Sequence, residues 1–148
     1  METVKDILHH KGTEVWAIGP DTKVHDALAL MKEKNIGALL VVDKNEKLRG
    51  VFSERDYARK SISEKEESIR PVDKPVSELM TTSVVYIKDD QTVEHCMGIM
   101  TEKRLRHLPV LHEGKISGLI SIGDVVKAVI HEKDFIIDQM EHYIWDNS

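Results

Sequence analysis

The sequence predicts a mixed α/β (α+β) fold built from two related halves, each with the element order β-α-β-β-α. Two observations lead to this prediction. The chain repeats itself at an interval of about 70 residues. In each half, apolar runs typical of buried strands also alternate with the apolar spacing of amphipathic helices. With 148 residues, the chain is long enough for one domain or for two small units that share a core.

Three segments carry the repeat. They match at offsets of 72, 69 and 68 residues: Val4–Leu8 with Val76–Met80, Val24–Leu28 with Val93–Met97, and Gly50–Asp56 with Gly118–Asp124. The offset changes only between Leu8 and Val15 and between Val42 and Leu48, where we expect loops, because loops tolerate a change of length at small entropic cost. A period this long is not that of a solenoid and indicates a duplicated half-domain.

In the first half, Val15–Ile18 is predicted to be a short strand. The apolar residues of the next helix recur with helical spacing at Val24, Ala27, Leu28 and Met31. Ala38–Val42 is a continuous apolar run, as in a strand buried on both faces, and Leu48–Phe52 follows after a turn as the next strand. Ser53 is the predicted N-cap of the second helix.

The second half repeats this order. Strands are predicted at Val84–Ile87, Leu108–Leu111 and Ile116–Ile120, and a second helix is predicted after an N-cap at Ser121. The helix between the first two strands has its apolar residues at Val93, Cys96, Met97 and Met100.

The chain divides at a charged segment. From Ser61 to Pro75 it has seven charged residues and two prolines, a composition typical of a solvated linker. We therefore expect a first repeat at residues 1–62, a linker at 63–75, and a second repeat with a C-terminal helix at 76–148.

The predicted C-terminal helix extends past the repeat. Ala128–Trp145 keeps a helical pattern in which Ile136, Met140 and Ile144 are spaced by four. Such an apolar stripe requires a partner surface.

Composition and charge limit the function classes. Hydrophobic residues make up 41% and charged residues 32% of the chain, as in ordinary globular proteins. The formal net charge of −5 argues against a general binder of nucleic acid or anionic membranes. The single cysteine, Cys96, excludes an intrachain disulfide and indicates a reducing, cytoplasmic location. No signal core and no long apolar run is present, so we expect neither secretion nor membrane insertion.

The candidate binding chemistry lies in the two segments that run from a glycine to Asp56 and to Asp124. The glycine permits close approach of a backbone or a ligand. Ser53 and Ser121 stand where a helix begins, and where N–H groups and the helix dipole favour an anion such as a phosphate. The aspartate three residues later can accept two hydrogen bonds from a ribose diol, like the acidic residue of dinucleotide-binding folds.

An interpretation without a ligand stays open. Ser-x-x-Asp is also a capping box, in which the two side chains satisfy N–H groups at the start of a helix. The two hypotheses differ in what the aspartate faces.

This duplicated pattern resembles a pair of CBS domains (cystathionine-β-synthase-type repeats) of the stand-alone two-repeat type. The resemblance covers about Val4 to Ile130. It rests on the Gly-hydrophobic-x-Ser-x-x-Asp element in both halves and on Leu108–Val110, which matches the family's Leu-Pro-Val strand. In the first half, Leu39–Leu40 stands where this strand has Leu-Pro.

The resemblance implies that the repeats pack as a pseudo-twofold pair and bind adenosine-containing ligands (AMP, ADP, ATP, NAD(H) or S-adenosylmethionine) in clefts between them. It also implies a homodimer formed through the CBS helices and a separate downstream partner protein. Carried over by position, one cleft takes Ser121, Asp124, Arg106 and His107 with Thr13 and Trp16, and the other takes Ser53, Asp56, Gly37 and Ala38 with Thr82 and Val85.

Basic and aromatic side chains near these elements suit a nucleotide. Arg55 and Arg59 follow the serine of the first half, and Arg104 and Arg106 precede the Leu-Pro-Val strand of the second; all four suit phosphate oxygens. Each arginine can equally lie on a solvated surface. Trp16 can stack on a base, or it can line the core.

No other chemistry is indicated. The eight histidines show no metal-ligand spacing with cysteine or carboxylates, so we expect no metal site. Cys96 falls on the apolar face of a helix, where a buried thiol is expected rather than a nucleophile. We therefore expect a regulatory sensor of an adenine nucleotide or dinucleotide (AMP, ATP or NAD) that is not an enzyme. The alternative is a structural, interaction or RNA-binding protein without a nucleotide ligand.

Overall fold

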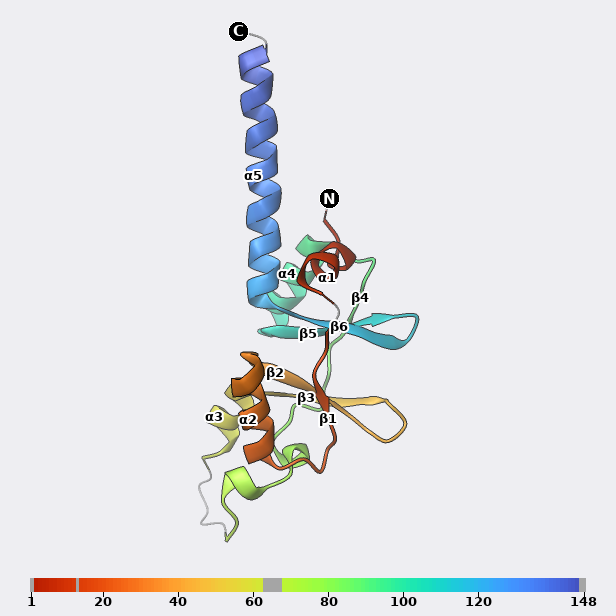
Figure 1. The fold of residues 1–148 in the computed structure, drawn as a ribbon, viewed down its shortest axis with the longest axis vertical. Helices are drawn as coiled ribbons and strands as arrows, with labels where there is room; N and C mark the ends of the chain where they lie inside the picture. The colour runs from red at the N-terminus through yellow and green to blue at the C-terminus, as the bar shows by residue number, and fades with distance from the viewer. Residues whose placement is uncertain (1, 13, 63–67, 147–148) are drawn as a thin grey trace. The chain divides into compact units, whose positions relative to one another are not determined.

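The protein forms two compact units that do not coincide with the two halves of the sequence. The structure is a computed structural model that describes residues 2–12, 14–62 and 68–146. Unit 1 combines residues 1–14 with 86–148, and unit 2 is residues 15–85. Each unit therefore contains the segment that precedes the first strand of the other half, here called the leading segment: residues 1–14 in unit 1 and residues 68–85 in unit 2. The colours of Figure 1 show the red N-terminal segment in the unit that holds the blue C-terminal helix.

Unit 2 is a three-stranded sheet with helices. Its elements are β1 (Ala17–Ile18), α2 (Val24–Lys34), β2 (Ala38–Val42), β3 (Leu48–Ser53), α3 (Glu54–Lys60) and the 3-10 turns η1 (Pro71–Asp73) and η2 (Val76–Glu78). The strand order is β1-β2-β3, with β1 parallel and β3 antiparallel to the central β2.

Unit 1 has the same sheet topology. Its elements are α1 (Val4–Lys11), β4 (Ile87–Lys88), α4 (Val93–Lys103), β5 (His107–His112), β6 (Lys115–Ser121) and α5 (Ile122–Asp146). The order is β4-β5-β6, with β4 parallel and β6 antiparallel to β5. The expected mixed α/β fold with a duplicated β-α-β-β-α order is confirmed.

The first strand of each unit is shorter than the sequence pattern predicts. The parallel pairing begins at Ala17 opposite Leu40 in unit 2, but only at Ile87 opposite Val110 in unit 1. Leu40 donates its N–H to the carbonyl of Trp16. Pro109, at the equivalent place in β5, has no N–H to donate, so the pairing in unit 1 starts one residue later.

The leading segments are pinned by matching pairs of backbone hydrogen bonds, which the repeat offsets did not reveal. In unit 1, the N–H of Val4 donates to Gln91 O at 2.9 Å and that of Val93 donates to Glu2 O at 3.1 Å. In unit 2, the equivalent bonds run from Val76 N to Thr22 O at 2.8 Å and from Val24 N to Lys74 O at 2.9 Å. Each helix start is thereby joined to the leading segment of the other half.

Each leading segment also completes a core. In unit 2, the buried cluster includes Phe52 and Leu39 of the sheet together with Val76 and Leu79. In unit 1, the buried residues from the leading segment are Val4, Ile7 and Leu8. Burying aliphatic side chains of this size stabilises a fold by about 1.5–3 kcal/mol each. The leading segments therefore belong energetically to the units that they enter.

Two equivalent glycines allow this close packing. A Cβ at Gly50 would lie 2.7 Å from Met80 Sδ and 2.8 Å from the carbonyl oxygen of Thr81. A Cβ at Gly118 would lie 2.5 Å from Leu8 Cδ2, a side-chain terminus. The glycine of each seven-residue segment is thus required for the approach of the leading segment.

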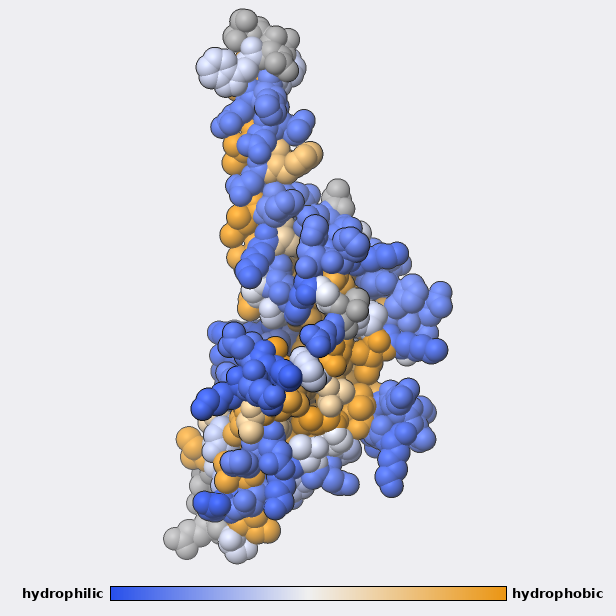
Figure 2. Space-filling model, viewed as in Figure 1, coloured by the Kyte–Doolittle hydropathy of each residue, from blue (hydrophilic) through white to orange (hydrophobic). Residues whose placement is uncertain are grey.

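Helix α5 carries an apolar stripe beyond the part that packs on α1 and α4. Ile130, Ile137, Met140 and Ile144 are about half exposed or more, with exposed fractions of 54%, 51%, 62% and 64%. Figure 2 shows hydrophobic residues along one side of this projecting helix. Across the described residues, no helix combines the length and the apolarity that crossing a bilayer requires.

We predict that Gly50→Ala destabilises the protein more than Gly118→Ala. The methyl group at residue 50 meets a backbone carbonyl as well as Met80, whereas that at residue 118 meets only the end of the Leu8 side chain, which can rotate. We expect Gly50→Ala to cost about 1–3 kcal/mol of unfolding free energy, as overpacking of a core typically does. Urea unfolding followed by circular dichroism measures this cost.

Gly98→Ala is the matched control, because a Cβ at this position in α4 would have nothing within 4 Å. This change should stabilise the helix by about 0.5–1 kcal/mol. Equal losses at residues 50 and 118 would contradict the assignment of the backbone contact to Gly50.

Candidate ligand-binding site

In unit 2, the serine and aspartate of the seven-residue segment form a capping box. Ser53 has extended backbone angles, φ −124° and ψ 164°, and its Oγ accepts the N–H of Asp56 at 3.1 Å. Asp56 Oδ2 accepts the N–H and the hydroxyl of Ser53 at 2.9 and 3.0 Å. These bonds fix where β3 ends and α3 begins.

The other oxygen of Asp56 faces the leading segment of unit 2. Asp56 Oδ1 accepts the hydroxyl of Thr81 at 2.9 Å, and Lys60 Nζ lies 3.5 Å away. Thr81 and Val51 also exchange backbone N–H···O bonds of 2.9 and 3.0 Å. Since an ionised carboxylate accepts about four hydrogen bonds, the acceptor capacity of Asp56 is largely used.

In unit 1, the same box lacks some of these bonds. Asp124 Oδ2 accepts the N–H of Ser121 at 2.8 Å, and Ser121 Oγ accepts the N–H of Asp124 at 3.2 Å. The second donor to Asp124 Oδ2 is the ammonium group of Lys11, at 2.6 Å. The bonds from Ser121 N–H and from Lys11 both reach Oδ2, whereas in Asp56 the Thr81 hydroxyl reaches the other oxygen, Oδ1.

Lys11 takes the place that Thr81 has in unit 2. The ammonium of Lys11 also donates to Leu119 O at 2.7 Å, and Leu119 is the repeat equivalent of Val51. In unit 2, Thr81 reaches the two equivalent acceptors with its backbone N–H and its hydroxyl. A flexible side chain in unit 1 thus does what a fixed backbone segment does in unit 2.

The environment of Asp124 favours its ionised form. Burial of the carboxyl acts to raise the pKa of Asp124, but hydrogen bonds from Lys11 and from Ser121, with the charge of Lys11, outweigh it and hold this pKa below its ordinary value of 3.8. The carboxylate is therefore ready to accept hydrogen bonds at neutral pH.

A cavity of about 370 Å³ lies beside this carboxylate, between α1 and α5 of unit 1. Its polar lining consists of four basic and two acidic side chains: His10, Lys11, Lys127, His131, Glu2 and Asp124. Its volume is within the range of small-molecule sites.

The structure brings the residues predicted for one site into unit 2. Gly37 contributes a carbonyl that accepts the N–H of Glu54 at the start of α3, at 3.1 Å. Ala38 is buried at the start of β2, while Thr82 is exposed and Val85 is half-buried after η2. Arg55 and Arg59 are exposed on α3 with Ser53 and Asp56 at its start.

The residues predicted for the other site are not all in one unit. Ser121, Asp124, Arg106 and His107 belong to unit 1, whereas Trp16 belongs to unit 2. Thr13 lies outside the described residues. The carbonyl of Arg106 accepts the N–H of Ile122 at 2.8 Å, which is the counterpart of the bond to Gly37.

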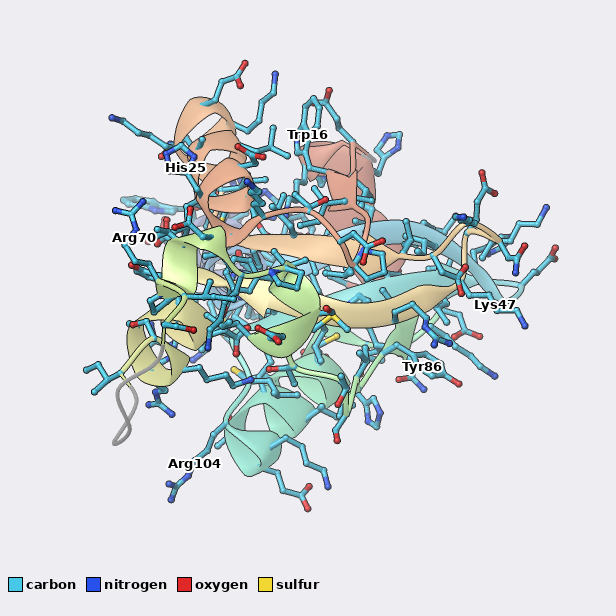
Figure 3. The ribbon with its side chains drawn as sticks, turned by 90° about the horizontal axis from the view of Figure 1, so that it is seen from below. Trp16, His25, Lys47, Arg70, Tyr86 and Arg104 are labelled. Atoms are coloured by element: carbon cyan, nitrogen blue, oxygen red, sulfur yellow. The ribbon has the colours of Figure 1, made fainter. Side chains whose placement is uncertain are left out.

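Trp16 and Arg104 have local structural roles. Trp16 packs against the core of unit 2, and Lys34 Nζ lies 4.4 Å from the centre of its ring. Arg104 ends α4 in the left-handed conformation, with φ 56°, and its side chain points outward (Figure 3).

Sequence analysis did not identify Lys11 and Thr81. Lys11 falls in the interval between Leu8 and Val15 where the repeat loses three residues, so alignment of the halves gives it no counterpart. Only the polar character of Thr81 and its position next to Thr82 could have indicated that it lies at the site.

The remaining chemistry is sparse among the described residues. No group of three or more His, Cys, Asp or Glu side chains in the described ranges has an arrangement that could hold a metal ion. Cys96 is fully buried, and burial raises the pKa of its thiol to about 11. This thiol is therefore protonated at neutral pH and unsuited to nucleophilic attack.

Comparison with known proteins agrees on the family. The family model of the CBS domain matches residues 4–63 and 76–131. The CBS domain-containing protein CBSX3, mitochondrial, of Arabidopsis thaliana is 35% identical over 151 residues, which cover 96% of this chain and 71% of that protein.

Solved structures share the fold. The crystal structure of the CBS domain NE2398 is 50% identical, with a TM-score of 0.80, and the match covers 88% of this chain and 99% of that chain. CBSX2, solved in complex with AMP, is 31% identical with a TM-score of 0.68, over 90% of this chain and 99% of that chain.

We predict that Lys11→Met lowers stability in a pH-dependent way. The variant loses an ion pair that is partly exposed, so we expect a cost of about 1 kcal/mol at pH 7. Because the folded-state pKa of Asp124 lies below 3.8, the pair contributes fully above that pH and loses its contribution as the pH falls through the folded-state pKa. Urea unfolding at a series of pH values measures the difference between the two proteins.

Lys5→Met is the control, because Lys5 lies exposed on the same helix and makes no ion pair with any described residue. Its small effect should not depend on pH between about 3 and 7, a range that runs from roughly one unit below the ordinary carboxyl pKa to neutrality. A Lys11→Met deficit that stays constant down to the acid end would contradict the ion-pair assignment.

Proposed function

The chain belongs to the CBS-domain family and carries two copies of the domain, and from this we propose that it is a regulatory module that binds an adenosine-containing ligand. It carries out no catalytic step. The response to the ligand passes to a separate partner protein. We further propose a reducing, cytoplasmic location, since the lone thiol is buried and forms no disulfide.

One observation carries this proposal. CBSX2, which is 31% identical across 90% of this chain, was solved with AMP. The match covers 99% of that chain, so the similarity extends over the CBS pair as a whole and not over a single motif.

The geometry supports unit 1 as the stronger of two sites. A ribose diol offers two hydrogen-bond donors, and a carboxylate at a helix start is suited to accept them. The Ser121 N–H and the Lys11 ammonium both donate to Asp124 Oδ2, whereas the donors to Asp56 are divided between its two oxygens. The proposed site in unit 1 comprises Ser121 and Asp124 with the adjacent cavity.

The absence of catalysis is supported by the chemistry of the candidate nucleophiles. The Ser53 and Ser121 hydroxyls serve as N-caps, and the Cys96 thiol is buried with a raised pKa. A ligand bound at such a site acts through its differential affinity for two states of the protein.

We predict that an adenosine ligand raises the melting temperature of the wild-type protein. At a ligand concentration of about 100 times Kd the gain is about 2.7 kcal/mol, which corresponds to several degrees for a chain of this size. A thermal-shift panel of AMP, ADP, ATP, NAD, NADH and S-adenosylmethionine measures it. Asp124→Ala should lose the largest response, and Asp56→Ala should retain it.

Asp6→Ala is a matched control, because Asp6 occupies the same third helical position in the capping box of α1. It should lower the melting temperature by loss of the cap but keep the full ligand response. The absence of any shift in the wild-type protein would overturn the proposed function and favour a structural or RNA-binding role, which salt-dependent RNA binding would reveal.

We also propose that α5 pairs in an antiparallel manner with α5 of a second copy of this chain. Lys133 and Glu141 fall at helical spacing among the apolar residues of the stripe: Lys133 lies between Ile130 and Ile137, and Glu141 between Ile137 and Ile144. Lys133 and Glu141 each lie four residues from Ile137, so two copies aligned at Ile137 place each lysine opposite a glutamate. Such flanking ion pairs set the orientation of the partner helices in coiled coils.

Charge reversal tests this pairing. Lys133→Glu alone and Glu141→Lys alone should each weaken the dimer by about tenfold, and the double reversal should restore it. Sedimentation equilibrium measures the dimer Kd. A wild-type protein that stays monomeric, or a double variant no better than the single ones, would contradict antiparallel pairing.

A further inference from the structure

The cavity between α1 and α5 has a lining suited to an anion. Four of its side chains are basic, namely those of His10, Lys11, Lys127 and His131. The two histidine rings lie 6.5 Å apart, and Lys127 stands one helical turn before His131 on α5.

Both acidic side chains of the cavity already have basic partners. Asp124 accepts from Lys11 at 2.6 Å, and Glu2 lies 3.4 Å from His131. A ligand that engages Asp124 through neutral hydroxyl groups must therefore displace the ammonium of Lys11. That ammonium loses its anionic partner unless the ligand supplies another.

Lys11 is able to move in a way that its counterpart cannot. Its side chain is 38% exposed and flexible, while the side chain of Asp124 is 18% exposed. In unit 2, Thr81 holds Asp56 from a backbone segment that is itself bonded to Val51 in both directions. These backbone bonds keep Thr81 beside Asp56 even when its hydroxyl turns away, whereas rotation of the long Lys11 side chain can clear Asp124 completely.

We propose that Lys11 makes the unit 1 site selective for phosphorylated adenosine ligands. When the ribose hydroxyls bind Asp124, the ammonium of Lys11 leaves the carboxylate and pairs with a phosphate of the ligand in the α1–α5 cavity, beside Lys127. This inference rests on the proposed function and adds to it the class of ligand and the residue that selects it.

The proposal predicts that removing the ammonium of Lys11 has opposite effects on the affinities for two ligands. Adenosine has no phosphate, so its binding costs the Lys11–Asp124 pair without replacement. AMP gives Lys11 a stronger partner than the one it loses, because a phosphate carries a charge of about −1.5 to −2 at pH 7 whereas the carboxylate carries −1. Removing the ammonium should therefore improve binding of adenosine and impair binding of AMP, a pattern that a merely structural role of Lys11 would not produce.

Calorimetric titration with adenosine and with AMP tests the proposal on wild type and Lys11→Met. We expect Lys11→Met to bind adenosine about fivefold more tightly and AMP about fivefold more weakly, as the loss or gain of one partly exposed ion pair gives. Lys11→Arg keeps the charge and should keep the preference for AMP. Lys127→Met should weaken AMP and leave adenosine unchanged, because Lys127 has no bond to Asp124 among the described residues.

Lys60→Met is the control from the equivalent place in unit 2, where Lys60 lies 3.5 Å from Asp56. It should change neither affinity. If Lys11→Met shifts both affinities in the same direction, or neither, the inference fails while the proposed function stands. If the wild-type protein binds neither adenosine nor AMP, the inference fails, and the proposed function is overturned only if the other ligands of the thermal-shift panel also give no response. Circular dichroism and the melting temperature of each variant establish that it is folded.

Discussion

An aspartate at the third position of the helix that follows each sheet holds three parts of its unit together. Asp56 joins the end of β3, the start of α3 and the leading segment at Thr81. Asp124 joins the end of β6, the start of α5 and the leading segment at Lys11. A half-buried carboxylate requires donors to offset its desolvation, so these aspartates order the elements that supply the donors.

In each unit the aspartate carboxylate has a structural role as a helix cap and a proposed role in binding a ligand. The units differ in how much of the carboxylate the structural hydrogen bonds occupy. In unit 2, hydroxyl and backbone donors on both oxygens of Asp56 fix the cap. In unit 1, an ammonium replaces the fixed donors of Thr81. Because Lys11 can swing away from Asp124, while backbone bonds to Val51 keep Thr81 beside Asp56, a duplicated fold acquires one site that can exchange its internal partner for a ligand.

Exchange of the leading segments explains why the duplication yields units that differ from the halves. Val4 and Val76 are buried in units otherwise built from the opposite half, and each is held by backbone bonds to the start of a helix. At Gly50 and Gly118, the absence of a Cβ leaves the space that the leading segment occupies. The glycine that marks the repeat in the sequence is therefore explained by packing, whether or not a ligand is bound.

The sequence by itself determined the element order, the buried strands and the two capping serines, because these follow from local periodicity and from side chains three residues apart. Ala38–Val42 is a strand with the bounds that its apolar run predicts. Tertiary structure alone decided which leading segment enters which unit and that Lys11 meets Asp124, 113 positions away. Such contacts depend on how distant segments pack. The repeat was the one local signal that could have revealed the partner of Lys11, but the halves cannot be aligned at Lys11 because three residues are lost beside it.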